Sequence, residues 1–264
     1  MKKIRVLSLY SGSTGNAFLI QGPKGSVLID AGKNAKHLCA SLGAAGVEPD
    51  EIQAILVTHE HSDHISALPV FLKKCRIPVH LARGCAYRLE NEPWAEELLC
   101  PHPPICSFEV AGMQVTSFPT PHDSRASVGY RFEIPNGDAS FTLGYATDIG
   151  YVTPQIVDAL TGCDAVILES NHDLDMLEEG PYPYDLKQRI LSRRGHLSNP
   201  DSALLAARLC ASGTKALMLA HLSRENNTPE IAYDDCHSAV GDESIEICVA
   251  HPDEITELTL EGIL

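Results

Sequence analysis

The sequence predicts an α+β fold: an αββα sandwich, in which two facing mixed β-sheets are flanked by helices. Apolar, strand-like segments dominate the first half of the 264-residue chain and are joined by turns that contain glycine. In the second half, strands alternate with helical patterns. The apolar content of 44% is that of an ordinary globular protein and is enough for a sizeable core.

The first half of the chain consists mainly of strands. They are expected, in order, at 4–9, 16–21, 26–31, 54–59, 77–82, 105–110, 113–118, 127–134 and 140–145. Two helices interrupt them, one at about 34–45 and one at 65–75, the latter despite Pro69. The segment AILVTH at 54–59 is almost entirely apolar, which indicates a buried strand.

Helices take a larger share of the second half. They are expected at 153–161, 184–193, 200–211 and 228–239, with strands at 165–170, 216–221, 245–250 and 255–260. Both halves run strands first and helices after, which suits a duplicated fold. No Gly/Ser linker, low-complexity run or short repeat divides the chain, so residues 1–264 are predicted to form a single domain.

The net charge of −15 is unevenly distributed along the chain. Ten of the 35 acidic residues lie in residues 226–264, which contain no Lys or Arg, so the remaining residues carry a net charge of only −5. Exposed charges more than about 8–10 Å apart are largely screened at physiological salt. The acidic segment therefore weakens a nucleic-acid-binding function without excluding it.

The cysteines and the N-terminal residues indicate in which cellular compartment the protein is located. The nine cysteines are scattered and form no CxxC pair, which argues against a disulfide framework and against a cysteine-rich zinc ribbon. The first residues, MKKIRVLSLYSGSTGN, lack the apolar stretch and the cleavage site of a signal peptide. No segment approaches the roughly 20 apolar residues of a membrane span. We therefore expect a cytoplasmic protein without membrane contact.

The segment THEHSDH at 58–64 is the strongest indication of a function. It follows the buried strand and precedes a helix, so it lies on a loop at the end of a strand. His59 and His61 are two residues apart and point the same way in extended backbone, whereas Asp63 and His64 turn toward a second ion. Imidazole and carboxylate ligands suit zinc, manganese or iron(II), and two such ions form a hydrolytic site.

Three further candidate ligands each follow an apolar strand. They are His122 in FPTPHDS, Asp148 in LGYATDIG and His221 in LMLAHLS. Considered separately, each is more simply an ordinary loop residue. Their shared position at a strand end makes convergence on one edge of the sandwich plausible.

These features together resemble the metallo-β-lactamase superfamily, over essentially the whole chain. Phrases of the chain that resemble the YycJ/WalJ branch of that superfamily are SGSTGN (11–16), VTHEHSDH (57–64), ATDIGYV (146–152), LESNHD (168–173), GPYPYDLKQRILS (180–192), GHLSN (195–199) and AHLSRENNTPE (220–230). That branch is described as exonucleases that degrade duplex DNA from a 5′ end.

The resemblance implies a ligand set for two metal ions. One ion would be held by His59, His61 and His122. The other would be held by Asp63, His64 and His221, and Asp148 would bridge the two. The chain departs from the pattern at none of these positions.

The same pattern indicates a mechanism. Two cations lower the pKa of a shared water, and the resulting hydroxide attacks phosphorus, with Asp63 placed to orient it. His196 in GHLSN is the candidate that serves the leaving oxygen, with Glu169 as its orienting carboxylate, as similar residues do in related RNA-processing enzymes. The alternative for His196 is a structural residue that precedes the helix cap SNPD.

Substrate-binding residues are less sharply indicated. Ser13 and Asn16 in SGSTGN are candidates for hydrogen bonds to phosphate, although a tight glycine turn explains that loop equally well. Arg189 and Arg193 are four residues apart on a predicted basic helix and are candidates for contacts with a DNA backbone. A solvated helix face is the alternative.

Three functions remain open from the sequence. The first is a metal-dependent exonuclease that acts on DNA from 5′ ends, with DNA repair proteins as possible partners. The second is a phosphodiesterase of a small or cyclic phosphodiester, which suits the acidic surface. The third is a metal-bound accessory of a repair complex without activity of its own, against which the full ligand set argues.

Overall fold

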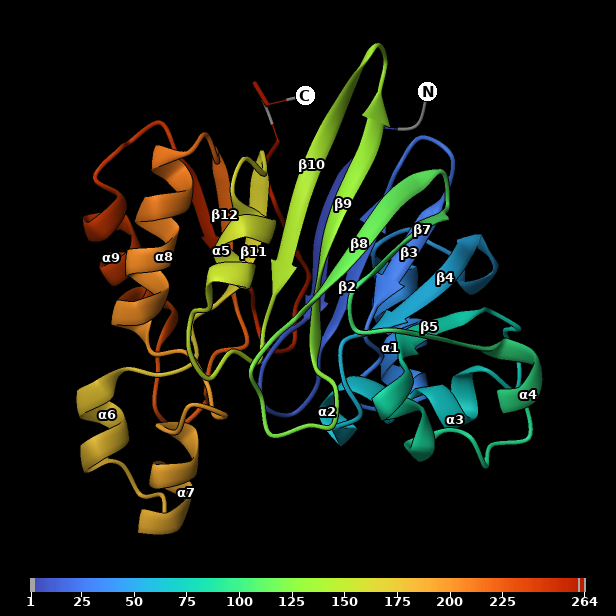
Figure 1. Cartoon of the computed structure of the whole chain (residues 1–264), viewed down its shortest axis with the longest axis horizontal. Coiled ribbons are helices and arrows are strands. Elements are labelled where there is room, and N and C mark those ends of the chain that lie inside the picture. The colour runs from blue at the N-terminus through green and yellow to red at the C-terminus, as the bar shows by residue number, and fades with distance from the viewer. Residues whose placement is uncertain (1–2, 261, 264) are drawn as a thin grey trace.

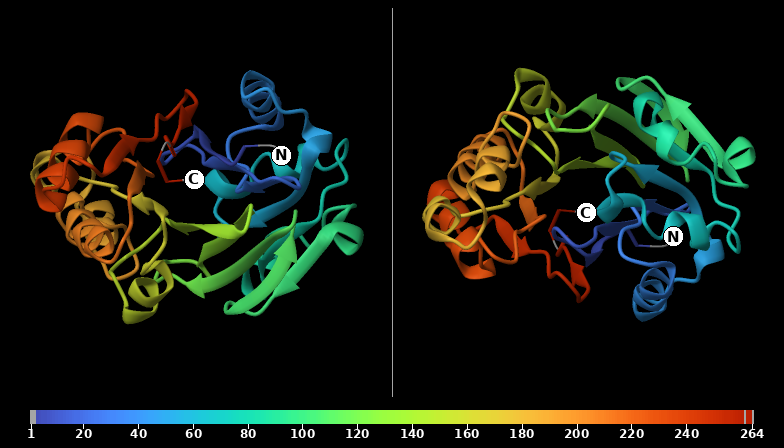
Figure 2. Two further views of the ribbon diagram at one scale, coloured as in Figure 1. Left: turned by 90° about the horizontal axis from the view of Figure 1, so that it is seen from above. Right: turned by 90° about the horizontal axis from the view of Figure 1, so that it is seen from below.

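A computed structural model of the chain describes residues 3–260, 262 and 263. Within these residues, two seven-stranded sheets face each other (Figures 1 and 2). In spatial order, the first sheet contains β14 (Thr256–Glu257), β1 (Arg5–Tyr10), β2 (Ala17–Gln21), β3 (Ser26–Ile29), β4 (Ile52–Val57), β5 (Val79–Ala82) and β6 (Leu99–His102). In the same way, the second sheet contains β13 (Glu246–Val249), β12 (Ala216–Ala220), β11 (Ala165–Glu169), β10 (Ala139–Ala146), β9 (Val128–Asn136), β8 (Met113–Pro119) and β7 (Cys106–Val110).

Helices cover the outer sides of the two sheets. Beside the first sheet lie α1 (Ala35–Ala44), α2 (Ser62–Ile65), α3 (Leu68–Phe71), α4 (Ala95–Leu98) and the 3-10 helices η1 (Pro49–Glu51) and η2 (Arg83–Arg88). Beside the second lie α5 (Pro154–Leu160), α8 (Asn199–Ala211) and α9 (Pro229–Val240). The short helices α6 (Leu174–Glu179) and α7 (Tyr184–Ile190) lie beyond the lower end of the sheets in Figure 1. The αββα sandwich that the sequence predicts is confirmed. The expectation of one domain over 1–264 stays a prediction, and residues 1, 2, 261 and 264 lie outside the described part.

Two apolar clusters hold the layers together. The larger fills the space between the sheets and contains side chains such as Phe18, Tyr130 and Phe132. The smaller lies between the second sheet and helices α5, α8 and α9, and contains Leu168 and Leu209. Strands buried on both faces read as continuous apolar runs, which explains why AVILE and ALMLA of β11 and β12 are buried at every position.

Strand direction brings the polar loops to one edge of the sandwich. Strands β10, β11 and β12 are parallel to one another, as are β3, β4 and β5. The loops that follow β4, β8, β10, β11 and β12 therefore meet at the lower end of the sheets in Figure 1. Carboxyl ends of parallel strands are a common location for binding sites.

Several predicted elements differ in extent from the observed ones. The helix expected at 65–75 is two short helices, α2 and α3, and Pro69 occupies the first turn of α3, where its missing N–H costs nothing. The helix expected at 184–193 ends at Ile190, because the chain folds back over its end and the backbone N–H of His196 bonds to the Ile190 carbonyl at 3.0 Å. The elements η1, η2, α4, α6 and β6 were not predicted from the sequence.

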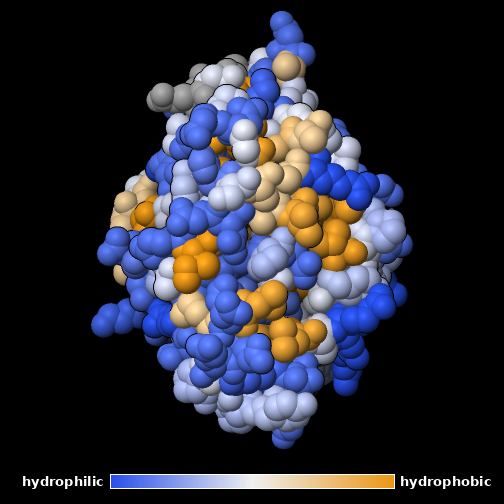
Figure 3. Space-filling model, turned by 90° about the vertical axis from the view of Figure 1, so that its left-hand side faces the viewer, coloured by the Kyte–Doolittle hydropathy of each residue, from blue (hydrophilic) through white to orange (hydrophobic). Residues whose placement is uncertain are grey.

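The outer surface shows no single large apolar face on the side that carries α8 and α9. Apolar residues there form several separate patches among hydrophilic ones (Figure 3). Scattered exposed apolar side chains are a normal feature of protein surfaces. No described helix is long and apolar enough to cross a membrane.

Candidate metal centre

The loop after β4 carries four of the predicted ligands. His59 is fully buried just beyond the strand, His61 precedes the first turn of α2, and Asp63 and His64 lie within that turn. A carboxylate of the neighbouring strand fixes this loop. Asp30 follows β3 and accepts hydrogen bonds from the Thr58 N–H at 2.8 Å, the Thr58 hydroxyl at 2.9 Å and His64 Nδ1 at 2.8 Å.

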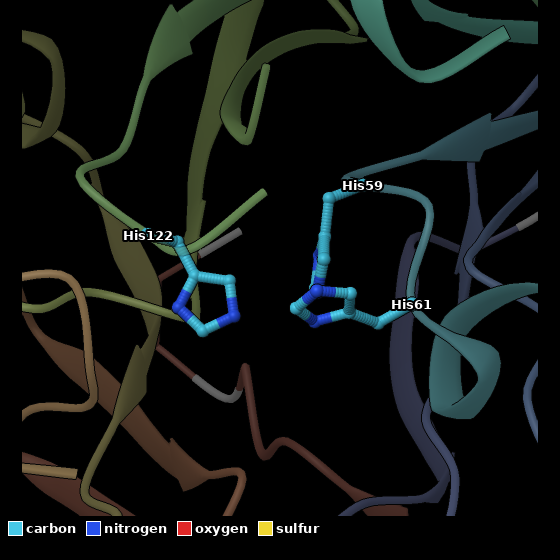
Figure 4. Close-up of side chains that lie close together, drawn as sticks. All are labelled: His59, His61 and His122. Atoms are coloured by element: carbon cyan, nitrogen blue, oxygen red, sulfur yellow. The ribbon is translucent and has the colours of Figure 1, made fainter. Parts of the chain in front are cut away.

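Three histidines face one another across the edge of the two sheets. His59 and His61 come from the loop of the first sheet, and His122 follows β8 of the second (Figure 4). The ring centroids of His59 and His61 are 4.5 Å apart, and those of His59 and His122 are 5.0 Å apart. One nitrogen from each ring lies within 4.8 Å of the other two, so the three can share one metal ion.

A second group lies beside the first. His64 Nε2 is 3.1 Å from Asp63 Oδ2, and His221 Nε2 is 3.6 Å from the same oxygen. Asp148 lies between the groups: its Oδ1 is 3.6 Å from His122 Nε2, and its Oδ2 is 3.5 Å from His64 Nε2. The structure thus brings all seven predicted metal residues together in two adjoining His/Asp clusters.

Four of the histidines use their outer nitrogen for a hydrogen bond. The Nδ1 partners lie 2.8–3.0 Å away and are, in order for His59, His64, His122 and His221, the Thr58 hydroxyl, the Asp30 carboxylate, the Gly195 carbonyl and the Glu169 carboxylate. In each case Nε2 is left for the centre of the site. Outer partners of this kind fix ring orientation at metal sites.

The inner atoms of the site fit a cation. Among the described residues, His59 Nε2, His221 Nε2 and Asp148 Oδ2 are buried without a hydrogen-bond partner. Such atoms are costly to bury unless something satisfies them. Burial and the charge of His64 hold the pKa of His59 well below its usual range, which favours the neutral imidazole that ligates metals.

The potential around His221 is set by carboxylates. Burial by itself would lower the pKa of His221, but the carboxylates of Asp148, Asp63 and Glu169 outweigh it and raise that pKa to about 10. A site that draws a proton onto a buried imidazole this strongly also attracts a divalent cation, which competes with the proton. The two His/Asp clusters are therefore consistent with a dinuclear metal site.

Backbone strain is concentrated at the same edge. Asp30, Asp148 and His221 each have φ near +59°, in the left-handed region that few residues other than glycine adopt. Strained backbone persists where the surrounding structure enforces it, and it is found preferentially at functional sites. The left-handed residue comes directly after β3 at Asp30 and after β12 at His221, and two residues after the end of β10 at Asp148.

Glu169 connects the metal residues to His196. Glu169 Oε1 is 2.8 Å from His196 Nδ1 and 2.9 Å from His221 Nδ1, and its Oε2 accepts the backbone N–H groups of Ile149 and Leu197. Burial raises the pKa of this carboxyl, but the charge of His196 and the bonds from both histidines lower it to about 2. His196 itself is only partly buried, and Glu169 contacts its Nδ1 and leaves its Nε2 unengaged by that carboxylate.

Two site residues escaped the sequence analysis. Asp30 stands at the end of a strand in SVLIDAG, and nothing in that phrase distinguishes it from an ordinary turn residue. Asp123 directly follows His122, and its Oδ1 lies 3.2 Å from His122 Nε2 and 3.7 Å from His61 Nε2. Its other oxygen is 2.5 Å from Arg189 Nε. The sequence could have suggested Asp123 only because it directly follows His122, a candidate ligand.

The predicted substrate-binding residues are placed differently from one another. Ser13 is exposed at the edge of the site, whereas Asn16 is fully buried. The Asn16 amide oxygen accepts the Gly12 N–H, and its amide nitrogen donates to the Gly12 carbonyl and lies 3.4 Å from His64 Nε2. Arg189 bonds to Asp123, which in turn lies beside His122 of the metal clusters. Arg193 lies beyond the end of α7 and packs over the Tyr151 ring at 4.0 Å, so the two arginines do not share a helix face.

Known proteins resemble the chain in sequence and fold. The family description "Beta-lactamase superfamily domain" matches residues 26–222. The chain is 36% identical over 231 residues to "Exodeoxyribonuclease WalJ" of Streptococcus pneumoniae serotype 2 (strain D39 / NCTC 7466), covering 85% of this chain and 84% of that protein. It is also 36% identical over 228 residues, with the same coverage, to "Exodeoxyribonuclease YycJ" of Bacillus anthracis.

Solved structures agree on the fold. The metallo-β-lactamase fold protein YhfI from Bacillus subtilis superimposes with a TM-score of 0.75 at 16% sequence identity, covering 96% of this chain and 98% of that one. The matched family, the shared fold and the two His/Asp clusters at the expected edge of the sandwich lead to one conclusion. The chain belongs to the metallo-β-lactamase superfamily and is a metal-dependent hydrolase.

Proposed function

We propose that the chain is a two-metal phosphodiesterase that degrades DNA from 5′ ends. The observation that carries this proposal is the pair of His/Asp clusters joined by Asp148, in a chain 36% identical to proteins named exodeoxyribonucleases. DNA is then the substrate, and proteins of DNA repair are the partners to examine first. Manganese and zinc are the first metals to test, with iron as a third, because the ligands are imidazoles and carboxylates.

The proposed roles are of two kinds: metal ligands, and residues that assist the reaction. We assign one ion to His59, His61 and His122, the other to Asp63, His64 and His221, with Asp148 shared. Two divalent ions, when bound, supply the Lewis acidity that activates water and stabilises charge on a phosphate oxygen. Asp63 is the least buried of the carboxylates in the two clusters, which suits it to orient the attacking water as well.

His196 is assigned to the leaving oxygen. Glu169 holds Nδ1 of its ring at 2.8 Å, so Nε2 remains to give a proton or positive charge to the departing sugar oxygen. The same carboxylate contacts Nδ1 of His221, so the position of His196 is coupled to that of a proposed metal ligand. On this proposal, one carboxylate orients both the proton donor and a residue that would hold a metal ion.

Cleavage of labelled duplexes tests the proposal. Purified protein loaded with manganese or zinc is incubated with duplex DNA labelled at either the 5′ or the 3′ end. Release of labelled mononucleotide from the 5′-labelled duplex at the earliest times is the expected result. Hydrolysis of a chromogenic phosphodiester without any cleavage of DNA would favour a small phosphodiester as the substrate and would overturn the proposal.

A further inference from the structure

Of the cavities beside the metal clusters, two that share residues differ in chemistry. The larger, about 620 Å³, opens on the side of His61 and Asp63 and is lined by four arginines: Arg88, Arg125, Arg189 and Arg194. The smaller, about 170 Å³, opens on the side of His122 and His196 and lies against α7. Asp123 and Arg189 line both cavities and therefore mark the boundary between them.

The arginines of the larger cavity are held in place by the protein. The Arg125 guanidinium lies 3.8 Å from the centre of the Tyr87 ring. Arg194 donates from Nε to the His122 carbonyl at 3.1 Å and from a terminal nitrogen to the Ser124 carbonyl at 3.3 Å. These contacts of Arg125 and Arg194 are with a ring and with carbonyls, so they leave two positive charges available, whereas Arg189 is paired with Asp123. Fixed positive charges along an open groove suit the phosphates of a nucleic-acid strand.

The smaller cavity has walls of another kind. Leu186 and Ile190 of α7 and the ring of Tyr182 provide its apolar side, while Ser13, Asn171 and Ser223 provide polar groups. Arg189 at the boundary is its one lysine or arginine among the described residues. A protein cavity of about 150 Å³ holds one benzene molecule, so this one is on the scale of a single ring system and too small for a strand.

We propose that the smaller cavity receives the terminal nucleobase of the DNA, while the phosphates of the remaining strand lie along the larger, arginine-lined cavity. The inference rests on the exonuclease function proposed above and deepens it. The scissile phosphate then lies at the metals, at the boundary marked by Asp123 and Arg189, with one nucleotide on the far side. A cavity with room for one base limits each cut to one nucleotide and makes the activity depend on a free end.

Duplexes that lack only the terminal base test this assignment. Two substrates are compared, identical except that one carries an abasic nucleotide at the 5′ end. Aromatic and apolar walls bind a base by stacking, so wild-type protein should cut the abasic end with kcat/KM about tenfold or more lower. Release of the second nucleotide should then proceed at the normal rate.

Two variants locate the effect. Leu186→Trp fills the cavity and should lower kcat/KM on the normal end by about tenfold, with little change on the abasic end. Leu191→Trp adds the same side chain at a half-exposed position that does not line the cavity, and should cut both substrates as wild type does.

The outcomes separate the two proposals. If wild-type protein cuts no DNA with any of the metals, the exonuclease function fails. If it cuts normal and abasic ends at equal rates, the function stands and the base-binding cavity is refuted, a result that does not depend on the folding of any variant. Equal slowing of both substrates by Leu186→Trp would also refute it, because a filled base cavity should not matter when the base is missing.

Discussion

The first sheet places its share of the metal centre on one loop, whereas the second sheet distributes its share over the ends of several strands. His59, His61, Asp63 and His64 all follow β4 within six residues. In the second sheet, His122 follows β8, Asp148 follows β10 and His221 follows β12. Local sequence therefore determines one side of the centre, and the packing of strands determines the other.

Each side also has its own supporting carboxylate. Asp30 supports the loop of the first sheet, and its contacts are with Thr58 of that loop and His64 of α2. Glu169 supports the second sheet, and it holds two rings, those of His221 and His196. The comparison predicts that damage to the first support mainly costs stability, while damage to the second side mainly costs turnover.

The largest effect is expected at the residue shared by both clusters. Asp148→Ala should remove at least one metal ion and nearly all hydrolysis, because its two oxygens face both groups of histidines. Metal content per chain and turnover are measured on the same preparation. Asp158→Ala, an exposed acid of α5, is the matched control and should keep both. Two metals and full activity in the Asp148 variant would contradict the assignment.

A slightly smaller loss is expected from His196→Ala. It should keep both metals but lower turnover of DNA by about 10²–10⁴, the usual contribution of a positioned acid or base. A p-nitrophenyl diester should suffer much less, because its leaving group needs little protonation. His237→Ala on α9 controls for loss of a histidine. Loss of metal would make His196 a ligand or a support, and equal slowing of both substrates would make it a phosphate-binding residue.

Asp30→Ala tests the support of the first sheet. It leaves the buried imidazole of His64 and the Thr58 groups without their partner, so the free energy of unfolding should fall by about 3–5 kcal/mol. Asp253→Ala breaks exposed pairs with Lys33 and Arg224 and should cost at most about 1 kcal/mol. Denaturant unfolding of both variants gives the comparison. Similar losses would mean that Asp30 has no special structural role.

The smallest effect is expected at Arg193. Arg193→Glu should weaken duplex binding several-fold and reduce its salt dependence by about one phosphate contact, with turnover of a small diester unchanged. The same charge change in Arg208→Glu, on α8, controls for net charge. Binding is measured across a salt series. If the two variants bind DNA alike, Arg193 lies outside the DNA path.

The same division explains what the sequence could and could not predict. The four predicted ligands after β4 lie within six residues, so their pattern alone indicates the site. His122 and Asp148 were reached by their position after apolar strands, a weaker signal that needs the fold to confirm proximity. Asp30 was missed because one acid after a strand carries no pattern, and its role depends on a contact with residues 28 and 34 positions away.

The wrongly predicted helix and strand bounds also result from contacts between residues that are distant in the sequence. Helical spacing put Arg189 and Arg193 on one helix, but α7 ends between them. The reversal there depends on Gly195, whose backbone lies against the carbonyls of Arg189 and Ile190 so closely that a Cβ would meet both. Tertiary packing of this sort overrides local propensity. The short elements α4 and β6 likewise depend on neighbours in space.

The position of the metal centre across the junction of two sheets has a consequence for the lifetime of the protein. Strands of the two sheets share no ladder in the described chain, so an ion bound by residues of both sheets would link them. A ligand that binds only the folded state stabilises it in proportion to the logarithm of its concentration. The metal concentration in the cell would then affect the resistance of the chain to proteolysis as well as its turnover.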